Sequence, residues 1–105
     1  MQLPRRVVVT GMGLISPLGN SVHESWSNCI KGISGISKNI VDLEGIPVKV
    51  GGRVKDFDPT QFIDSKDVRR LDTFVQYGVS AGIQAIEDAG IAVSYTHLRA
   101  HETGY

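Results

Sequence analysis

The 105-residue sequence has a single cysteine, no long hydrophobic run and no net charge. Because Cys29 has no partner for an internal disulfide, the sequence favours a reducing compartment. No stretch approaches the ~20 apolar residues of a membrane-spanning helix, and the apolar run at 7–9 is too short for a signal peptide. Eleven Lys and Arg balance eleven Asp and Glu, which argues against a general nucleic-acid or membrane-surface binder. We therefore expect a cytoplasmic protein with no nucleic-acid and no membrane partner.

Glycine, by contrast, is abundant: the chain has 12 glycines in 105 residues, above the usual ~7%. No Gly-X-Y repeat is present, so we expect these glycines to serve turns and close approaches between backbones. A chain of this length is enough for one small domain, which would expose much of its surface and be marginally stable alone.

A run of β-branched residues at 7–10 predicts a strand buried on both faces of an α/β sheet. Gly11 and Gly13 follow it and suggest a dinucleotide-binding loop. The G-x-G-x-x-G pattern is not completed, because Ser16 stands at the third glycine position and the next helix begins only near Ser21. A nucleotide-binding domain is therefore the weakest of the hypotheses that we carry forward.

The first helix is expected to begin at Ser21, since Glu24 three residues later completes a capping box, and to end at Gly32. Its apolar positions form a narrow stripe, namely Val22, Trp26, Cys29 and Ile30. Cys29 lies near the C-terminal end, where the helix dipole disfavours a thiolate. We therefore interpret Cys29 as a packed thiol, with an activated nucleophile as the weaker alternative.

A second helix is predicted from about Lys66 to Ala89, with Gly90 at its end. Before it, residues 33–47 are expected to be loop, 49–54 a short strand and 60–63 one helical turn. Small residues on the second helix would let another element approach closely, namely Gly78, Ala81, Gly82 and Ala85.

Three cations, Lys66, Arg69 and Arg70, are spaced so that they share one face in the first turns of this helix. Cations at a helix N-terminus oppose the macrodipole, so their presence needs a reason. One hypothesis is that this face docks an acidic partner or a phosphate. The alternative is that nearby carboxylates offset the charge, namely Asp64, Asp67 and Asp72.

Histidines offer little for a metal site. His97 and His101 have the i, i+4 spacing of two zinc ligands, but no third ligand is evident and His23 is expected to be solvated. We predict no metal.

Taken together, the motifs resemble the β-ketoacyl-[acyl-carrier-protein] synthases, and most closely the type II enzymes of fatty acid synthesis. The resemblance is carried, in order and at the spacing of the family, by residues 5–13, 16–20, 52–57 and 69–78. It covers residues 4 to about 92. It implies an α/β chain that forms the N-terminal portion of a thiolase-like αβαβα layered fold and leaves that fold incomplete.

The resemblance also implies an activity, the decarboxylative Claisen condensation of malonyl-carrier protein with an acyl thioester. The family's catalytic cysteine and two histidines fall beyond residue 105 in its pattern, and neither Cys29 nor His97 and His101 match them. We therefore assign no catalytic residue, and expect no cofactor besides the phosphopantetheine arm that carries the substrates. The family forms homodimers, in the bacterial cytoplasm or in organelles.

One surface carries over from the family, because Lys66, Arg69 and Arg70 match the basic patch that docks the acidic acyl carrier protein. Residues 93–105 depart from the family and resemble a translated adaptor sequence, so we predict family sequence over 1–92 and a non-native tail over 93–105. We expect a fragment of a condensing enzyme that is inactive alone. The alternative from another class is a non-catalytic acyl-carrier-protein-binding module.

Overall fold

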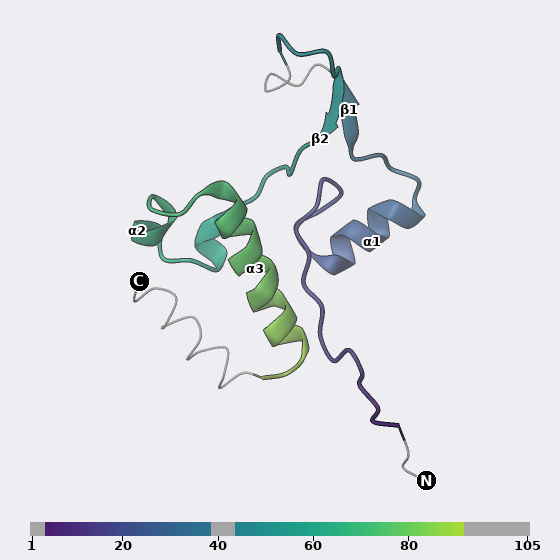
Figure 1. Ribbon diagram of the computed structural model, residues 1–105, viewed down its shortest axis with the longest axis vertical. Helices are drawn as coiled ribbons and strands as arrows, with labels where there is room; N and C mark the ends of the chain where they lie inside the picture. The colour runs from purple at the N-terminus through teal and green to yellow at the C-terminus, as the bar shows by residue number, and fades with distance from the viewer. Residues whose placement is uncertain (1–3, 39–43, 92–105) are drawn as a thin grey trace.

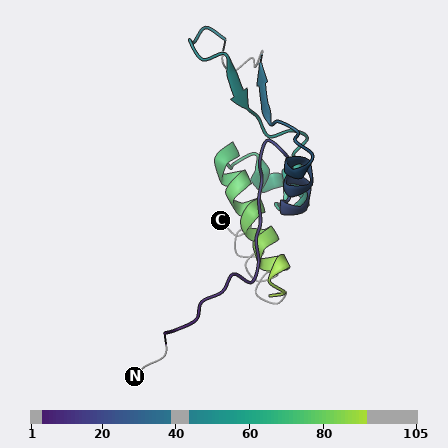
Figure 2. The same ribbon diagram turned by 90° about the vertical axis from the view of Figure 1, so that its right-hand side faces the viewer.

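The computed structural model describes residues 4–38 and 44–91. Its elements are, in order, α1 (Val22–Ile30), β1 (Ile36–Lys38), β2 (Val50–Gly52), the 3₁₀ helix η2 (Pro59–Gln61), α2 (Ser65–Val68) and α3 (Thr73–Asp88). The N-terminal segment passes between α1 and α3, and the β1–β2 pair lies at one end of the molecule (Figure 1). The turned view shows the same pair projecting beyond the helices (Figure 2). The arrangement is a mixed helix and strand structure.

The predicted strand at 7–10 is wrong in its burial and in its pairing. The three valines are 84%, 64% and 79% exposed, and the segment pairs with no strand among the described residues. Within those residues the only sheet is antiparallel β1–β2, with Ser37 opposite Gly51. A β-branched run favours extended backbone, but a buried strand also needs neighbours that accept its ladder hydrogen bonds. The segment has the conformation that its sequence favours, and lacks the sheet.

Gly11 and Gly13 bring the extended segment directly against α3. A Cβ atom at Gly13 would overlap the carbonyl oxygen of Ala81 and lie 2.8 Å from the backbone nitrogen of Ala85. A Cβ atom at Gly11 would lie 2.6 Å from the backbone nitrogen of Ala89. These two glycines therefore permit a close approach between backbones, which the sequence predicts for its glycines in general.

Side chains of α3 then bind the backbone of this segment. The Met12 N–H donates to Oδ2 of Asp88 at 3.0 Å, and the Leu14 N–H donates to Oε1 of Gln84 at 3.3 Å. Residues two apart on an extended strand and four apart on a helix have nearly equal spacing along their axes. Gln84 and Asp88 thus provide acceptors for two backbone donors that no strand among the described residues pairs with.

Helix α1 begins and ends as its sequence predicts. Ser21 Oγ accepts from the Glu24 N–H at 3.1 Å, and Gly32 follows the helix with a φ of 76°. The Ile33 N–H then returns to the Asn28 carbonyl at 3.0 Å, which completes a Schellman motif.

The buried face of α1 is polar, so the expectation of a packed Cys29 is wrong. Cys29 is exposed, as are its stripe neighbours Trp26 and Ile30. The buried contacts come from Ser25, whose Oγ lies 2.7 Å from the hydroxyl oxygen of Ser16 in the preceding turn. The apolar stripe lacks a partner within residues 4–38 and 44–91.

Two further predictions concern the middle of the chain. The strand expected at 49–54 is present as β2, but its partner β1 lies inside the stretch that the sequence predicts to be loop. The helical turn expected at 60–63 is present as η2, one residue earlier. A three-residue strand leaves too little alternation to be recognised in a sequence.

The single helix predicted over 66–89 is wrong, because residues 69–72 separate α2 from α3. The end of α3 is as predicted, with Gly90 at a φ of 78°. The core is small: among the described residues, only Ile63 and Ile83 are buried hydrophobic side chains. A Cβ atom added at Gly78 or at Gly82 would meet no described neighbour within 4 Å, so that part of the small-residue face is open here.

Candidate functional site

The three predicted cations lie around α2, and the structure gives them different roles. Lys66 lies inside α2, Arg69 is its C-cap, and Arg70 is in the turn beyond it. All three are exposed. The prediction that they share one face of a long helix is wrong, because the helix ends before Arg69.

Arg70 binds a buried carboxylate. Its Nη2 forms an ion pair and hydrogen bond with Oδ1 of Asp67, whose side chain is only 4% exposed. The Arg70 side chain is 53% exposed. Asp67 Oδ2 has no hydrogen-bond partner in the part of the chain that the structure describes. Arg70 therefore compensates a charge that could not otherwise stay buried at acceptable cost.

The side chain of Gln76 forms hydrogen bonds across the break between α2 and α3. Its Nε2 donates to the carbonyl oxygens of Val68 and Leu71, each at 3.0 Å. These carbonyls belong to the end of α2 and the turn after it, and the Val68 carbonyl also accepts from the Leu71 N–H at 3.4 Å. The Asp72 carbonyl accepts from the Gln76 N–H at 3.0 Å as α3 begins. Residues 69–72 thus form a turn between the two helices, and the carbonyls of Val68 and Leu71 keep hydrogen-bond donors there.

The segment before α2 is tied to α3 and capped by its own side chain. The rings of Phe57 and Tyr77 meet edge to face, with centroids 5.2 Å apart. Asp58 Oδ1 accepts from the Thr60 N–H at 3.0 Å at the start of η2. The hydroxyl of Thr60, and then its backbone N–H, hold the pKa of Asp58 below its usual range. These contacts fix the approach of the chain to α2.

Local carboxylates offset only one of the three cations. Asp64 and Asp72 are exposed, and within residues 4–38 and 44–91 neither forms an ion pair with Lys66 or Arg69. Lys66 and Arg69 are thus presented to solvent without an acidic partner among the described residues. The docking hypothesis therefore depends on Lys66 and Arg69.

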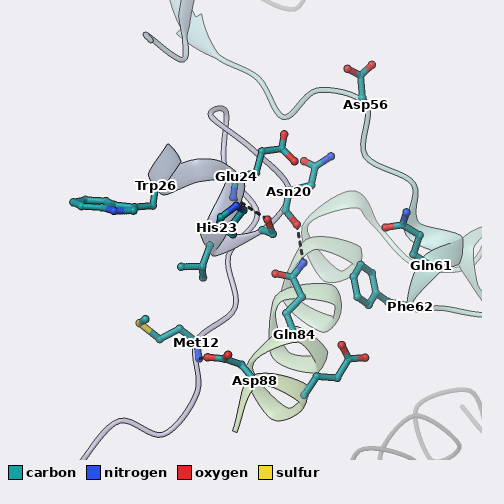
Figure 3. A pocket seen from close by; sticks show the side chains of 13 residues that line it. Met12, Asn20, His23, Glu24, Trp26, Asp56, Gln61, Phe62, Gln84 and Asp88 are labelled. Atoms are coloured by element: carbon teal, nitrogen blue, oxygen red, sulfur yellow. Dashed lines mark hydrogen bonds between the residues drawn. The ribbon is translucent and has the colours of Figure 1, made fainter. Parts of the chain in front are cut away.

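A separate open groove runs between α1, α3 and the segment at 56–62, and Figure 3 shows its walls. Gln84 lines this groove, and the Nε2 atom of Gln84 donates to the Asn20 carbonyl at 2.8 Å (Figure 3). The charged residues that line it are acidic apart from His23, namely Glu24, Asp56, Glu87 and Asp88. Among the described residues that line the groove there is no cysteine, lysine or arginine, so they provide neither a thiol nucleophile nor the predicted cations.

The described residues offer neither a metal centre nor a membrane-spanning helix. They contain no group of three or more His, Cys, Asp or Glu side chains that could hold a metal ion. They include no helix with the length and apolar character needed to cross a membrane. The predictions about His97, His101 and the tail at 93–105 lie outside the described residues.

Comparison with known proteins gives a consistent result. Residues 4–105 match the family model described as "Beta-ketoacyl synthase, N-terminal domain". The chain is similar to proteins named 3-oxoacyl-[acyl-carrier-protein] synthase 2. It is 49% identical to the protein from Vibrio harveyi and 50% identical to that from Vibrio cholerae, in each case over 92 residues and 86% of this chain. It is 41% identical over 95 residues, 90% of this chain, to the protein from Staphylococcus aureus strain COL.

The chain spans only about a fifth of these relatives. The matched part is 22% of each Vibrio protein and 23% of the staphylococcal one. The family model reaches residue 105, whereas the pairwise matches extend over 92 or 95 residues. The division between family sequence and a foreign tail at residue 92 stays a prediction.

Proposed function

This chain belongs to the β-ketoacyl synthase family through the N-terminal domain of that family, and we propose on this premise that it serves as the corresponding part of a 3-oxoacyl-[acyl-carrier-protein] synthase. The relatives that bear this name match it at up to 50% identity. The proposed reaction is the decarboxylative condensation of malonyl-carrier protein with an acyl thioester. We place no catalytic residue in this chain, and the proposed cysteine and histidines belong to the part of the relatives that it does not cover.

Within that enzyme, we propose that the chain contributes the surface that receives the acyl carrier protein. The observation that carries this proposal is the pair of exposed cations, Lys66 and Arg69, which no carboxylate among the described residues neutralises. Exposed charges of one sign accelerate the encounter with an oppositely charged partner, and salt weakens the effect. An acidic carrier protein would be attracted to this surface before its phosphopantetheine arm reaches a catalytic centre.

The layered αβαβα fold is likewise proposed for the whole enzyme. The exposed extended segment at 7–10 and the open face at Gly78 and Gly82 support it, since both have the composition of buried elements. In this proposal, the segment becomes a central strand once further strands flank it. Dimer formation by the whole enzyme belongs to the same proposal. So does a cytoplasmic location, because a lone cysteine is typical of a reducing compartment.

A chimera tests the proposed function. The part of this chain that matches the Vibrio harveyi synthase would replace the corresponding part of that enzyme, and condensation would be assayed with malonyl-carrier protein. We expect an active enzyme, because the two sequences are 49% identical there, and no activity from the 105-residue chain alone. A folded chimera without activity would contradict the proposal. The synthase without that part is the control for background.

Charge reversal in the chimera tests the docking surface. K66E/R69E is expected to raise KM for the carrier protein at low salt with little change in kcat, because the loss affects encounter rather than chemistry. The matched control is K31E/K38E, which reverses the exposed lysines at the C-cap of α1 and at the end of β1. An unchanged KM in K66E/R69E, or an equal rise in the control, would show that these cations do not dock the carrier protein.

A further inference from the structure

Arg70 differs from the other two cations because its charge is already used inside the protein. Its guanidinium donates to Oδ1 of Asp67, and Oδ2 of the same carboxylate has no partner among the described residues. The Asp67 side chain is almost fully buried, so its charge depends on Arg70. A partner that drew Arg70 toward itself would leave this carboxylate uncompensated. Arg70 thus has a role inside the protein that no ion pair within residues 4–38 and 44–91 gives to Lys66 or Arg69.

The position of the pair suggests what it does instead. Helix α2 has four residues, far fewer than a helix needs to be stable in isolation. The Arg70 N–H also donates to the Asp67 carbonyl, at 3.0 Å, so side chain and backbone close the same turn. Lys66 precedes Asp67 directly, and Arg69 precedes Arg70 directly. Whatever fixes Asp67 against Arg70 also fixes the spacing of the two exposed cations.

We propose that Asp67 and Arg70 form a positioning pair for the carrier-docking surface. Lys66 and Arg69 contact the acidic carrier protein, while Arg70 acts through Asp67 by holding the turn that presents them. The inference rests on the proposed function, since it assumes that this surface receives the carrier protein. It assigns different roles to three cations that the sequence presents as one patch.

Double variants of the 105-residue chain with equal net charge distinguish two roles for Arg70. One is direct contact with the carrier protein, and the other is positioning of the turn through Asp67. R70Q leaves the buried Asp67 unpaired, whereas D67N/R70Q removes both charges. D64N/R70Q has the same net charge as D67N/R70Q, but neutralises the exposed Asp64 and leaves Asp67 buried and unpaired. The affinity for holo-acyl carrier protein would be measured at low salt. Amide hydrogen exchange at Val68 and Arg70 would be measured in the absence of carrier protein.

The expected pattern has three parts. R70Q weakens binding and accelerates exchange at both amides. D67N/R70Q recovers both properties, whereas D64N/R70Q recovers neither. K66Q and R69Q each weaken binding by about two- to fivefold, the usual range for exposed charges, and leave exchange unchanged.

Other patterns overturn the proposal or its premise separately. If neither double variant recovers binding, Arg70 is itself a contact. If both recover it equally, net charge alone decides affinity. If R70Q leaves amide exchange unchanged, the pair does not hold the turn, whatever the affinity. If K66Q and R69Q bind as tightly as the original chain, the docking surface is wrong, and the exchange data still decide whether Asp67 and Arg70 hold the turn.

Discussion

Substituting alanine at Gly13 and at Gly82 should change stability in opposite directions. At Gly13 the added methyl would overlap the Ala81 carbonyl oxygen and lie 2.8 Å from the backbone nitrogen of Ala85. Both atoms belong to the backbone of α3, which cannot rotate away as a side chain would. The extended segment must therefore move off the helix. At Gly82 the added methyl meets no atom of the described residues within 4 Å, apart from the backbone of its own helix.

The magnitudes follow from these surroundings. Overpacking against rigid atoms costs about 1–3 kcal/mol. Moving the segment also endangers the 3.3 Å hydrogen bond from the Leu14 N–H to Gln84, worth about 1 kcal/mol. We therefore expect G13A to lower the free energy of unfolding by about 2–4 kcal/mol. G82A should raise it by about 1 kcal/mol, because alanine is the better helix former.

Urea unfolding followed by far-UV circular dichroism measures both variants under the same conditions. Each substitution adds one methyl group to a glycine, so their difference isolates the surroundings of the two sites. A G13A variant as stable as the original chain would refute the close approach of the N-terminal segment to α3. A destabilised G82A variant would show that this face of α3 is covered.

Two further predictions concern local capping. S21A should lower the free energy of unfolding by about 1 kcal/mol, because the Glu24 N–H loses its acceptor; an unchanged urea midpoint would contradict this. T60A should raise the pKa of Asp58 toward its ordinary 3.8, because the hydroxyl bond is the main cause of the lowering. The lowered folded pKa means that the Asp58 contribution is present above pH ~3.8 and is lost as pH falls through the folded value. An NMR titration in which T60A and the original chain share one Asp58 pKa would refute it.

Features that depend on neighbouring residues could be predicted from the sequence. Ser21 with Glu24, and the glycines at 32 and 90, specify where helices begin and end through hydrogen bonds within a single turn. The sequence predicts close approaches for its glycines in general, but it does not indicate that Gly11 and Gly13 are the ones that contact α3.

Features that depend on distant contacts could not be predicted in the same way. The periodicity of 66–89 is helical throughout, so nothing in it indicates that the Gln76 side chain will donate to the carbonyls of Val68 and Leu71. Asp67 and Arg70 have the i, i+3 spacing of a pair, but the spacing does not reveal that the carboxylate is buried. The prediction of a buried strand at 7–10 is wrong because burial of this segment requires other strands, and none lies beside it among the described residues.

The most direct test of the docking claim is the salt dependence of binding between this chain and holo-acyl carrier protein. The account predicts measurable affinity at low salt, a fall as salt rises, and a weaker, flatter dependence in K66E/R69E than in K31E/K38E. Equal affinity of K66E/R69E and the original chain across the salt range would contradict it.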